Sequence, residues 1–438
     1  MSNTFRKNIE APNWIKNQAI YEVNLRQYTK GGTFREFEEH LPRLKELGVG
    51  VLWFMPIQPI GQKNRKGSLG SYYSIQNYTA INPEFGTMEE FKSLVKKIHD
   101  LEMKVIIDWV ANHTAWDHHW TVDHPDFFDR NENGDFLPPN PEWTDVIHLN
   151  YGNPALWYEM ISQMEFWIRE TDVDGFRCDM AHLVTTLFWN HARYHLDKVK
   201  PVFMLAETEN HDLVEFAFDV IYNWKLLHGL NDLAAGRINA ADVLTIAKNG
   251  ADYLPKGAAE LNFTENHDEN SWNGSAIERI HYFLEPVTVL TFTLPGIPLI
   301  YCGQEAGNYK RLSFFDKDEI LWKEDKMSRL YQTLIEVRKR NPALWSGSGS
   351  SGFQLLTTSF SPQVAAFKRF SGENEVIVVA NLGHTEVTGV VEMNADAGAY
   401  LDIFTLKEYN PASSCQLTLP AFGYKVCEKN VISNLSDT

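Results

Sequence analysis

Short apolar runs alternate with longer stretches of helical periodicity along most of the chain. Eight runs rich in β-branched and aromatic residues read as strands, and they cover residues 20–23, 49–56, 104–110, 174–179, 202–207, 218–222, 260–263 and 297–303. Strands that alternate with helices over about 320 residues predict an α/β protein built on a (β/α)8 barrel. An open dinucleotide-binding sheet is disfavoured, because no Gly-rich turn follows an early strand.

Two helix starts carry a recognisable capping pattern. Thr33 is followed three residues later by Glu36, and Thr87 by Glu90. A Thr side chain that accepts from the third backbone N–H, with the Glu reaching back to the Thr N–H, forms a capping box. We therefore expect helices to begin at both positions.

Two regions depart from the barrel pattern. The connection between Asn112 and Asn150 is too long for a plain crossover and predicts a small inserted subdomain after the third strand. A Ser/Gly-rich stretch at 346–352 then leads into strand-like runs separated by turn signals. We place the barrel at 14–112 and 151–343, the subdomain at 113–150, and a C-terminal antiparallel β-sandwich domain at 344–432.

Composition narrows the choice of partners. The 438 residues carry a net charge of -17, which opposes binding to a nucleic-acid backbone or to an anionic membrane. A neutral sugar is compatible with this field, and 26 Phe, 13 Trp and 17 Tyr supply rings on which sugars could stack. The sequence does not predict the oligomeric state.

Targeting and redox signals are weak. Residues 1–13 contain no apolar core of a signal peptide, so we expect a cytoplasmic protein, or a periplasmic or secreted one if a signal was removed. The longest apolar stretch, 287–302, is interrupted by Pro295 and Gly296, and it is shorter than the roughly 20 residues of a membrane span. Four cysteines without a CxxC spacing favour buried thiols, although Cys415 and Cys427 could meet across a hairpin.

Acidic residues stand at or just after the ends of four apolar runs. They are Asp108, Asp179, Glu207 and Asp268, and Arg177 precedes Asp179 by two positions. Side chains at i and i+2 of a strand share a face, so Arg177 and Asp179 point the same way. A carboxylate at a buried strand end is costly unless it is paired or used. Such a set can hold negative charge against a developing positive charge, which is what a glycosidase requires.

These four segments resemble, in order and spacing, the four signature regions of the α-amylase family, family 13 of the glycoside hydrolases. Residues 48–57 are similar to the family's second strand, 70–87 to its tyrosine-bearing loop, and 296–305 to its eighth strand. The resemblance covers nearly the whole chain. It implies a barrel whose catalytic groups lie at the carboxyl ends of the strands.

The resemblance implies that Asp179 is the nucleophile, Glu207 the general acid/base and Asp268 the third carboxylate. A retaining glycosidase needs its first two carboxyls about 5–5.5 Å apart. Arg177 on the same face is expected to lower the pKa of Asp179 and keep it ionised. The apolar strand and the charge of Asp179 are expected to favour the protonated form of Glu207. A buried structural pair of Arg177 with Asp179 is the alternative.

Further positions are implied to bind substrate. The family's sugar-stacking tyrosine corresponds to Tyr73 rather than to Tyr72, and His113 and His267 correspond to hydrogen-bonding histidines. Taken singly, Tyr73 could be loop packing and the histidines could be buried structural groups. Asp108 is expected to be structural and to hold Arg177.

The inserted subdomain brings aromatic residues of undecided role. Trp116, Trp120 and Trp143 fit a sugar platform and a subdomain core equally well. Where many family members have a Lys-His pair after the nucleophile, this chain has His182 and Leu183. The contacts to distal sugars are therefore not implied by the resemblance.

No cofactor is expected to be required. Calcium-binding members use the residue equivalent to Asn112 and an Asp at the position of His148, and replacing a hard carboxylate by an imidazole disfavours calcium. Asp129, Asn131 and Asn133 resemble the start of an oxygen-ligand calcium loop without its final Glu, and a tight Asn-Gly turn explains the same pattern. We therefore predict no metal site and keep calcium as the weaker alternative.

Three functions remain open. The first is a retaining hydrolase acting on α-1,4-glucosidic bonds of malto-oligosaccharides or starch-type glucans. The second is a transglycosylase or isomerase of the same fold that acts on small α-glucosides. The third is an inactive family member that serves as a binding subunit, which the complete carboxylate set disfavours. The small subdomain favours short substrates over granular starch.

Overall fold

The computed structural model describes residues 10–347, 351–360, 362–392, 399–409 and 414–429. Residues 1–9 of the N-terminal segment lie outside the described residues. So do residues 348–350 of the expected Ser/Gly-rich stretch and residues 430–432 at the end of the expected C-terminal domain.

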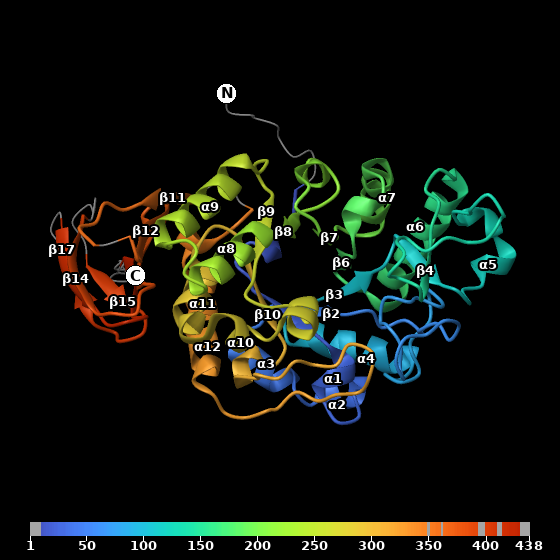
Figure 1. The fold of residues 1–438 in the computed structure, drawn as a ribbon, viewed down its shortest axis with the longest axis horizontal. Helices are drawn as coiled ribbons and strands as arrows, with labels where there is room; N and C mark the ends of the chain where they lie inside the picture. The colour runs from blue at the N-terminus through green and yellow to red at the C-terminus, as the bar shows by residue number, and fades with distance from the viewer. Residues whose placement is uncertain (1–9, 348–350, 361, 393–398, 410–413, 430–438) are drawn as a thin grey trace, which may run out of the picture.

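Eight parallel strands close into a barrel in the centre of the molecule (Figure 1). In chain order the barrel strands are β1 Ile20–Val23, β2 Val51–Phe54, β3 Lys104–Trp109, β6 Gly175–Cys178, β7 Phe203–Ala206, β8 Val220–Tyr222, β9 Ala259–Asn262 and β10 Ile297–Tyr301. β1 pairs with both β2 and β10, which completes the closure. Every strand expected from the apolar runs is present, so the predicted fold class is confirmed.

Helices surround the barrel with their apolar faces inward. They are α1 Leu25–Tyr28, α2 Phe34–Glu38, α3 Leu41–Leu47, α4 Met88–Asp100, α6 Pro154–Thr171, α7 Thr186–Val199, α8 Trp224–Ala234, α9 Ala240–Tyr253, α10 Ala276–Ile280, α11 Leu284–Thr293 and α12 Lys326–Arg340. In α4 the buried side chains recur at helical spacing, on Phe91, Leu94, Val95 and Ile98. This periodicity is what docks the helix on the sheet.

The two expected helix starts are both present, but only one capping box closes. Thr87 and Glu90 make the reciprocal pair that starts α4. Thr33 accepts from the backbone N–H of Glu36 at the start of α2, as expected. The Glu36 carboxylate instead accepts from the N–H of Gly31, at 2.7 Å. The preceding Gly-Gly turn offers that donor within reach, so the box stays open.

The insertion after β3 is a small subdomain at the edge of the barrel. Strands β4 His113–Ala115 and β5 Val146–His148 pair antiparallel, and α5 Trp120–Asp123 lies between them in the chain. Figure 1 shows this subdomain and the C-terminal strands at opposite sides of the barrel.

The C-terminal part consists of two antiparallel sheets that share one apolar core. Its strands are β11 Gly352–Leu355, β12 Val364–Ser371, β13 Asn374–Asn381, β14 Val387–Glu392, β15 Tyr400–Asp402, β16 Glu408–Tyr409, β17 Ser414–Leu419 and β18 Tyr424–Lys429. The expected antiparallel β domain is therefore confirmed, while the exact limits of the three domains stay predictions. Cys415 and Cys427 are free thiols.

Two buried arginines lie at the base of the barrel, and one of them connects it to the C-terminal strands. Arg369 on β12 donates to the carbonyl of Thr293 at the end of α11, at 2.9 Å. Arg338 on α12 donates to the carbonyls of Gln18 and Leu344, at 3.0 and 2.7 Å. Neither guanidinium forms an ion pair within the described residues.

None of the helices described is both long and apolar enough to span a bilayer.

Candidate active site

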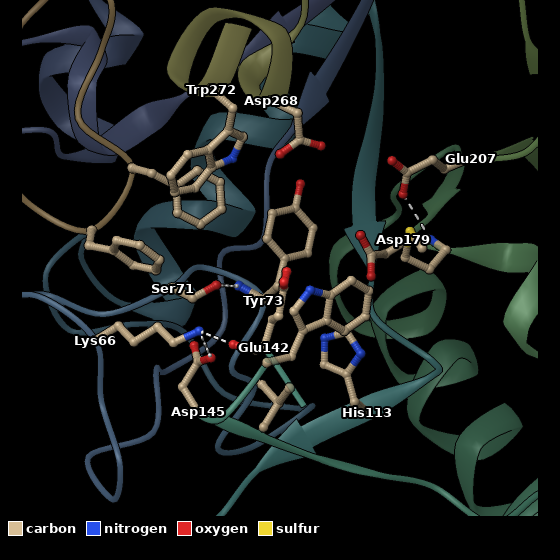
Figure 2. Close-up of a pocket in the computed structure, with 15 residues that line it drawn as sticks. Lys66, Ser71, Tyr73, His113, Glu142, Asp145, Asp179, Glu207, Asp268 and Trp272 are labelled. Atoms are coloured by element: carbon tan, nitrogen blue, oxygen red, sulfur yellow. Dashed lines mark hydrogen bonds and ion pairs between the residues drawn. The ribbon is translucent and has the colours of Figure 1, made fainter. Parts of the chain in front are cut away.

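A cavity of about 430 Å³ opens at the carboxyl ends of the barrel strands. Its lining residues come from several strand ends, the loop after β2, the inserted subdomain and the loops after β9 and β10 (Figure 2). They are Lys66, Ser71, Tyr73, His113, Glu142, Trp143, Asp145, Val146, Asp179, Met180, Glu207, Asp268, Trp272, Phe314 and Phe315. The three carboxylates that were assigned catalytic roles, Asp179, Glu207 and Asp268, therefore all line this cavity.

Arg177 is the centre of the charge network beneath this cavity. Its side chain is fully buried, and Nη1 lies 3.0 Å from Asp108 and 3.1 Å from Asp179. Nη2 lies 2.9 Å from Glu207, an ion pair without hydrogen-bond alignment. Nε donates to the hydroxyl of Tyr222 at 3.1 Å. The guanidinium thus fixes three carboxylates at once and neutralises only part of their charge.

The pKa values of the two central carboxyls are shifted in directions opposite to those expected. Burial and the charge of Glu207 raise the pKa of Asp179 well above its usual range, and Arg177 only partly opposes this. Burial acts to raise the pKa of Glu207 too, but Arg177 and the N–H of Met180, which donates at 2.8 Å, lower it overall. The sequence analysis assigned Arg177 to Asp179 alone, whereas the guanidinium also reaches Glu207. The two carboxyls interact strongly, and the shifts favour the ionised form of Glu207 over that of Asp179.

Asp108 is surrounded by donors and does not line the cavity. Its Oδ2 accepts from the indole of Trp53 at 3.1 Å and from the hydroxyl of Tyr73 at 3.2 Å, in addition to Arg177. Burial raises its pKa to about 6 against the opposing effect of Arg177. This arrangement fits the expected structural role of holding Arg177 in place.

Tyr73 and His267 form a hydrogen-bonded wall of the cavity. The hydroxyl of Tyr73 lies 2.7 Å from Nε2 of His267, and the two rings are stacked at 5.4 Å. Tyr72 points away from the cavity and donates to Asn24 at 2.8 Å. The structure therefore places the tyrosine chosen from the sequence, and not its neighbour, at the site.

A buried glutamate on the first strand orients His267. Oε1 of Glu22 lies 2.5 Å from Nδ1 of His267, and Oε2 of Glu22 has no partner among the described residues. Nε2 of His267 lies 3.3 Å from Asp268. Burial acts to lower the pKa of His267, but Asp268 and Glu22 raise it to about 9. The imidazole is therefore a cation at neutral pH, able to donate from both nitrogens.

His113 is the neutral counterpart of His267 on the other side of the cavity. Burial, assisted by His148, lowers its pKa to about 3. Nδ1 of His113 lies 3.1 Å from the amide nitrogen of Asn112, which leaves the opposite edge of the ring toward the cavity. A neutral imidazole in this position can donate one hydrogen bond to a sugar hydroxyl without adding positive charge.

The subdomain tryptophans divide between the two open interpretations. Trp143 lines the cavity and lies 5.6 Å from the ring of His113. Trp120 is fully buried among Tyr78, His118 and Phe127, so it belongs to the core. Trp116 is packed against the core from the outside.

The candidate metal ligands make hydrogen bonds with one another. The imidazole of His148 bridges Asp129 and Asn112, at 2.6 and 3.1 Å. Oδ1 of Asn131 accepts from the backbone N–H groups of Asn133 and Asp135, both at 2.9 Å, as in an Asx turn. Within the described residues, no cluster of three or more His, Cys, Asp or Glu side chains is arranged to bind a metal ion. The side-chain oxygens of Asn112, Asp129 and Asn131 are thus already in hydrogen bonds with protein groups.

Glu22, Trp272 and Phe314 are residues of the site that the sequence analysis did not identify. Glu22 lies in an apolar strand outside any motif. The sequence marks it only as an isolated acidic residue between β-branched and aromatic neighbours. Trp272 and Phe314 lie in loops whose positions the strand pattern does not fix. Of these two aromatic residues, only Trp272 could have been suspected, because it follows Asp268 by four residues.

The assembled site can stabilise positive charge on a bound neutral molecule. Three carboxylates, Asp179, Glu207 and Asp268, face the cavity, and Arg177 offsets only part of their charge. An aromatic wall beside them offers an apolar face to a ring-shaped ligand. This combination suits a reaction in which a sugar carbon becomes cationic.

Comparison with known proteins agrees with this geometry. The model of the α-amylase catalytic domain matches residues 13–145 and 142–376, and the model of the maltogenic amylase C-terminal domain matches residues 353–426. An α-amylase of Haloarcula japonica is 26% identical over an alignment of 404 residues, which covers 87% of this chain and 58% of that protein. A maltogenic α-amylase of Bacillus acidopullulyticus is 25% identical over 482 residues, covering 96% of this chain and 78% of its own length.

Solved structures give the same result. A maltogenic α-amylase from Thermotoga neapolitana superimposes with a TM-score of 0.87 at 28% identity, covering 95% of this chain and 99% of that one. An α-amylase from Lactobacillus plantarum follows with a TM-score of 0.85, also at 28% identity, covering 95% of this chain and 100% of that one. The chain belongs to the α-amylase family of glycoside hydrolases.

Proposed function

We propose that this protein is a retaining hydrolase that cleaves α-1,4-glucosidic bonds of malto-oligosaccharides and related glucans. The observation that carries the proposal is the convergence of Asp179, Glu207 and Asp268 on one cavity that is walled by Tyr73. The names of the relatives, which include maltogenic amylases and a cyclomaltodextrinase, support this class of substrate.

In the first step Asp179 attacks the anomeric carbon and forms a glycosyl ester, while the bond to the leaving sugar breaks. Glu207 gives its proton to the leaving oxygen, so no charge is left on the departing sugar. One proton has to be on Glu207 when this happens, although the pKa shifts of the pair favour the protonated form of Asp179. A sugar carbon that becomes positive beside Asp179 favours its anionic form and moves the proton to Glu207.

In the second step the ester no longer carries the charge of Asp179. Glu207, now deprotonated, takes a proton from a water molecule as the water oxygen attacks the anomeric carbon from the leaving-group side. The ester bond breaks at the same time, and Asp179 leaves as a carboxylate. Asp268 and His267 bind sugar hydroxyls through both steps, with the carboxylate accepting and the imidazolium donating. Two inversions at one carbon give a product with the anomeric configuration of the substrate.

We further infer that this activity needs no calcium. The imidazole of His148 bridges Asn112 and Asp129 directly, so hydrogen bonds join the segments that a cation would otherwise join. Reaction at the sugar is carried by carboxylates and requires no Lewis acid in this scheme.

The test uses maltotriose, a cyclodextrin and starch, with product anomers followed by NMR. We expect cleavage with α-configured products, fastest on the short substrates, and loss of all activity in Asp179→Asn. Initial β-anomers would exclude retention. Longer oligosaccharides or rearranged disaccharides as main products would identify a transglycosylase or an isomerase, and binding without turnover would identify a binding subunit.

A further inference from the structure

The aromatic wall of the cavity continues beyond Tyr73. Phe314, in the loop after β10, is parallel to Tyr73, with ring centroids 6.3 Å apart and an interplanar angle of 15°. Trp272, in the loop after β9, lies 5.2 Å from Phe314. We propose that Trp272 and Phe314 bind the second glucose unit on the non-leaving side of the cleaved bond. The inference rests on the proposed function and specifies how that site holds its substrate.

The exposure of Trp272 is unusual for so large an apolar side chain. Trp272 is 54% exposed even though it lines the catalytic cavity. Exposing an indole to water costs little free energy when its face serves as a stacking surface for a ligand. The C–H face of a glucose ring is complementary to such a surface. The ring therefore offers more contact area to a ligand than it gives to the fold.

The platform is rigid before any sugar binds. The side-chain oxygen of Asn270 accepts from the backbone N–H of Leu312 at 2.7 Å, and the hydroxyl of Ser271 donates to the carbonyl of Leu312 at 2.8 Å. On the other side, Ser68 donates to Asp316 through its N–H and its hydroxyl, at 2.8 and 2.6 Å. A loop fixed at both ends loses little entropy when a ligand binds.

The position of Glu207 decides which part of the substrate reaches this platform. The general acid must contact the leaving oxygen, so the leaving sugars lie on the side of Glu207. Figure 2 shows Trp272 and Glu207 on opposite sides of Tyr73. The sugar next to the one over Tyr73, on the side away from Glu207, is therefore the one that Trp272 meets.

Polar groups surround the same rings, as a sugar edge requires. A second hollow of about 400 Å³ shares Trp272 and Phe314 with the catalytic cavity and is bordered by Arg311, Asp316 and Asp318. Charged side chains around an aromatic face supply donors and acceptors for the hydroxyls of a ring stacked on that face. The platform thus has both components of a carbohydrate subsite.

The experiment measures how one substrate is divided between two products. 4-Nitrophenyl α-maltoside gives maltose and nitrophenol when both sugars lie on the non-leaving side, and glucose and nitrophenyl glucoside when only one does. We expect the wild type to favour maltose. Trp272→Ala should shift the maltose-to-glucose product ratio toward glucose by about tenfold, the factor that corresponds to about 1.4 kcal/mol. A ratio of products does not depend on the fraction of folded enzyme.

Two variants serve as controls. Trp272→Phe should restore most of the maltose preference, and Tyr253→Ala, which removes an exposed ring of α9 that does not line the cavity, should leave the ratio unchanged. An unchanged ratio in Trp272→Ala with active wild type overturns the subsite alone. A wild type that releases neither nitrophenol nor glucose overturns the proposed function as well, so the two failures are distinct.

Discussion

Buried arginines occur at both ends of the barrel, and their surroundings differ. At the catalytic end, Arg177 meets three carboxylates. At the base, Arg338 and Arg369 meet backbone carbonyls. Burial acts to lower the pKa of all three guanidinium groups. The neighbouring carboxylates, of which Asp108 has the largest effect, nevertheless raise the pKa of Arg177. The pKa values of Arg338 and Arg369 fall to about 9.

The difference separates two uses of the same side chain. At the base each guanidinium donates to backbone carbonyls, and that of Arg369 joins α11 to β12 of the C-terminal strands, which contributes to stability. At the catalytic end one cation is surrounded by more negative charge than it can neutralise, which costs stability and favours a cationic sugar. Disturbing the first arrangement should therefore unfold the protein, and disturbing the second should inactivate it.

The largest effect should come from the carboxylate that the mechanism consumes. Asp179→Asn removes the nucleophile and should lower kcat by about ten-thousand-fold, with an unchanged or slightly raised Tm because burial and Glu207 already disfavour the carboxylate form. Nitrophenol release and thermal unfolding followed by circular dichroism measure the two quantities. Asp252→Asn, an exposed aspartate of α9, is the matched control. Activity above a tenth of wild type would show that Asp179 is not the nucleophile.

The base arginines should show the reverse behaviour. Arg369→Met leaves carbonyls such as that of Thr293 unpaired and should lower the free energy of unfolding by about 3 kcal/mol, with kcat per folded molecule unchanged. Urea unfolding and active-site titration measure this. Arg340→Met, which removes a half-exposed arginine paired with Glu428 in the same region, should cost less than about 1 kcal/mol. Equal losses in the two variants would contradict the carbonyl-bridging role.

The sequence predicted one of these two ends far better than the other. Asp179, Glu207 and Asp268 stand beside buried strands, and strand ends in a barrel converge by geometry, so their meeting could be foreseen. Arg338 and Arg369 lie in a helix and a strand that no motif marks, and their partners are carbonyls without any side-chain signature. Contacts of that kind depend on loop paths, which local periodicity does not determine.

The catalytic end was also predicted incompletely. Placing Arg177 beside Asp179 followed from alternation along one strand. Its additional reach to Glu207, on the neighbouring strand, depends on a side-chain rotamer and on barrel curvature. That contact reversed the expected order of the two pKa values, so the protonation of the pair could not be read from residue spacing.

A smaller effect should come from Glu22, which together with Asp268 raises the pKa of His267. The pKa of His267 is raised from 6.5 to about 9, so the imidazolium is present below about pH 9 and is lost as the pH rises through that value. Glu22→Gln removes one raising charge and should move the alkaline limb of kcat/KM to lower pH by about one unit. Glu260→Gln, a buried glutamate of β9 that does not line the catalytic cavity, should leave the limb in place.

The pH profile of nitrophenyl maltoside cleavage is the measurement for both variants. A uniform loss of kcat without displacement of the limb would show that Glu22 is a packing residue. Displacement by both variants would show that the limb reports general unfolding rather than His267.

The smallest effect, close to zero, should follow removal of divalent ions. The imidazole of His148 bridges Asn112 and Asp129 by hydrogen bonds, so no ion is needed to join them. Dialysis against EDTA should leave Tm and activity unchanged. His148→Asp restores a hard ligand and should make Tm rise by a few degrees on addition of calcium. A fall in the wild-type Tm with EDTA would contradict the absence of a metal site.

The contact of Glu22 with His267 joins positions 245 residues apart in the chain. The first of them leaves the ribosome early, whereas the second is followed by the strand β10 that closes the ring against β1. During translation the glutamate therefore stays without its partner until most of the barrel has been synthesised. A chain that stops before residue 267 therefore lacks this contact, and it lacks the carboxylate of Asp268 as well.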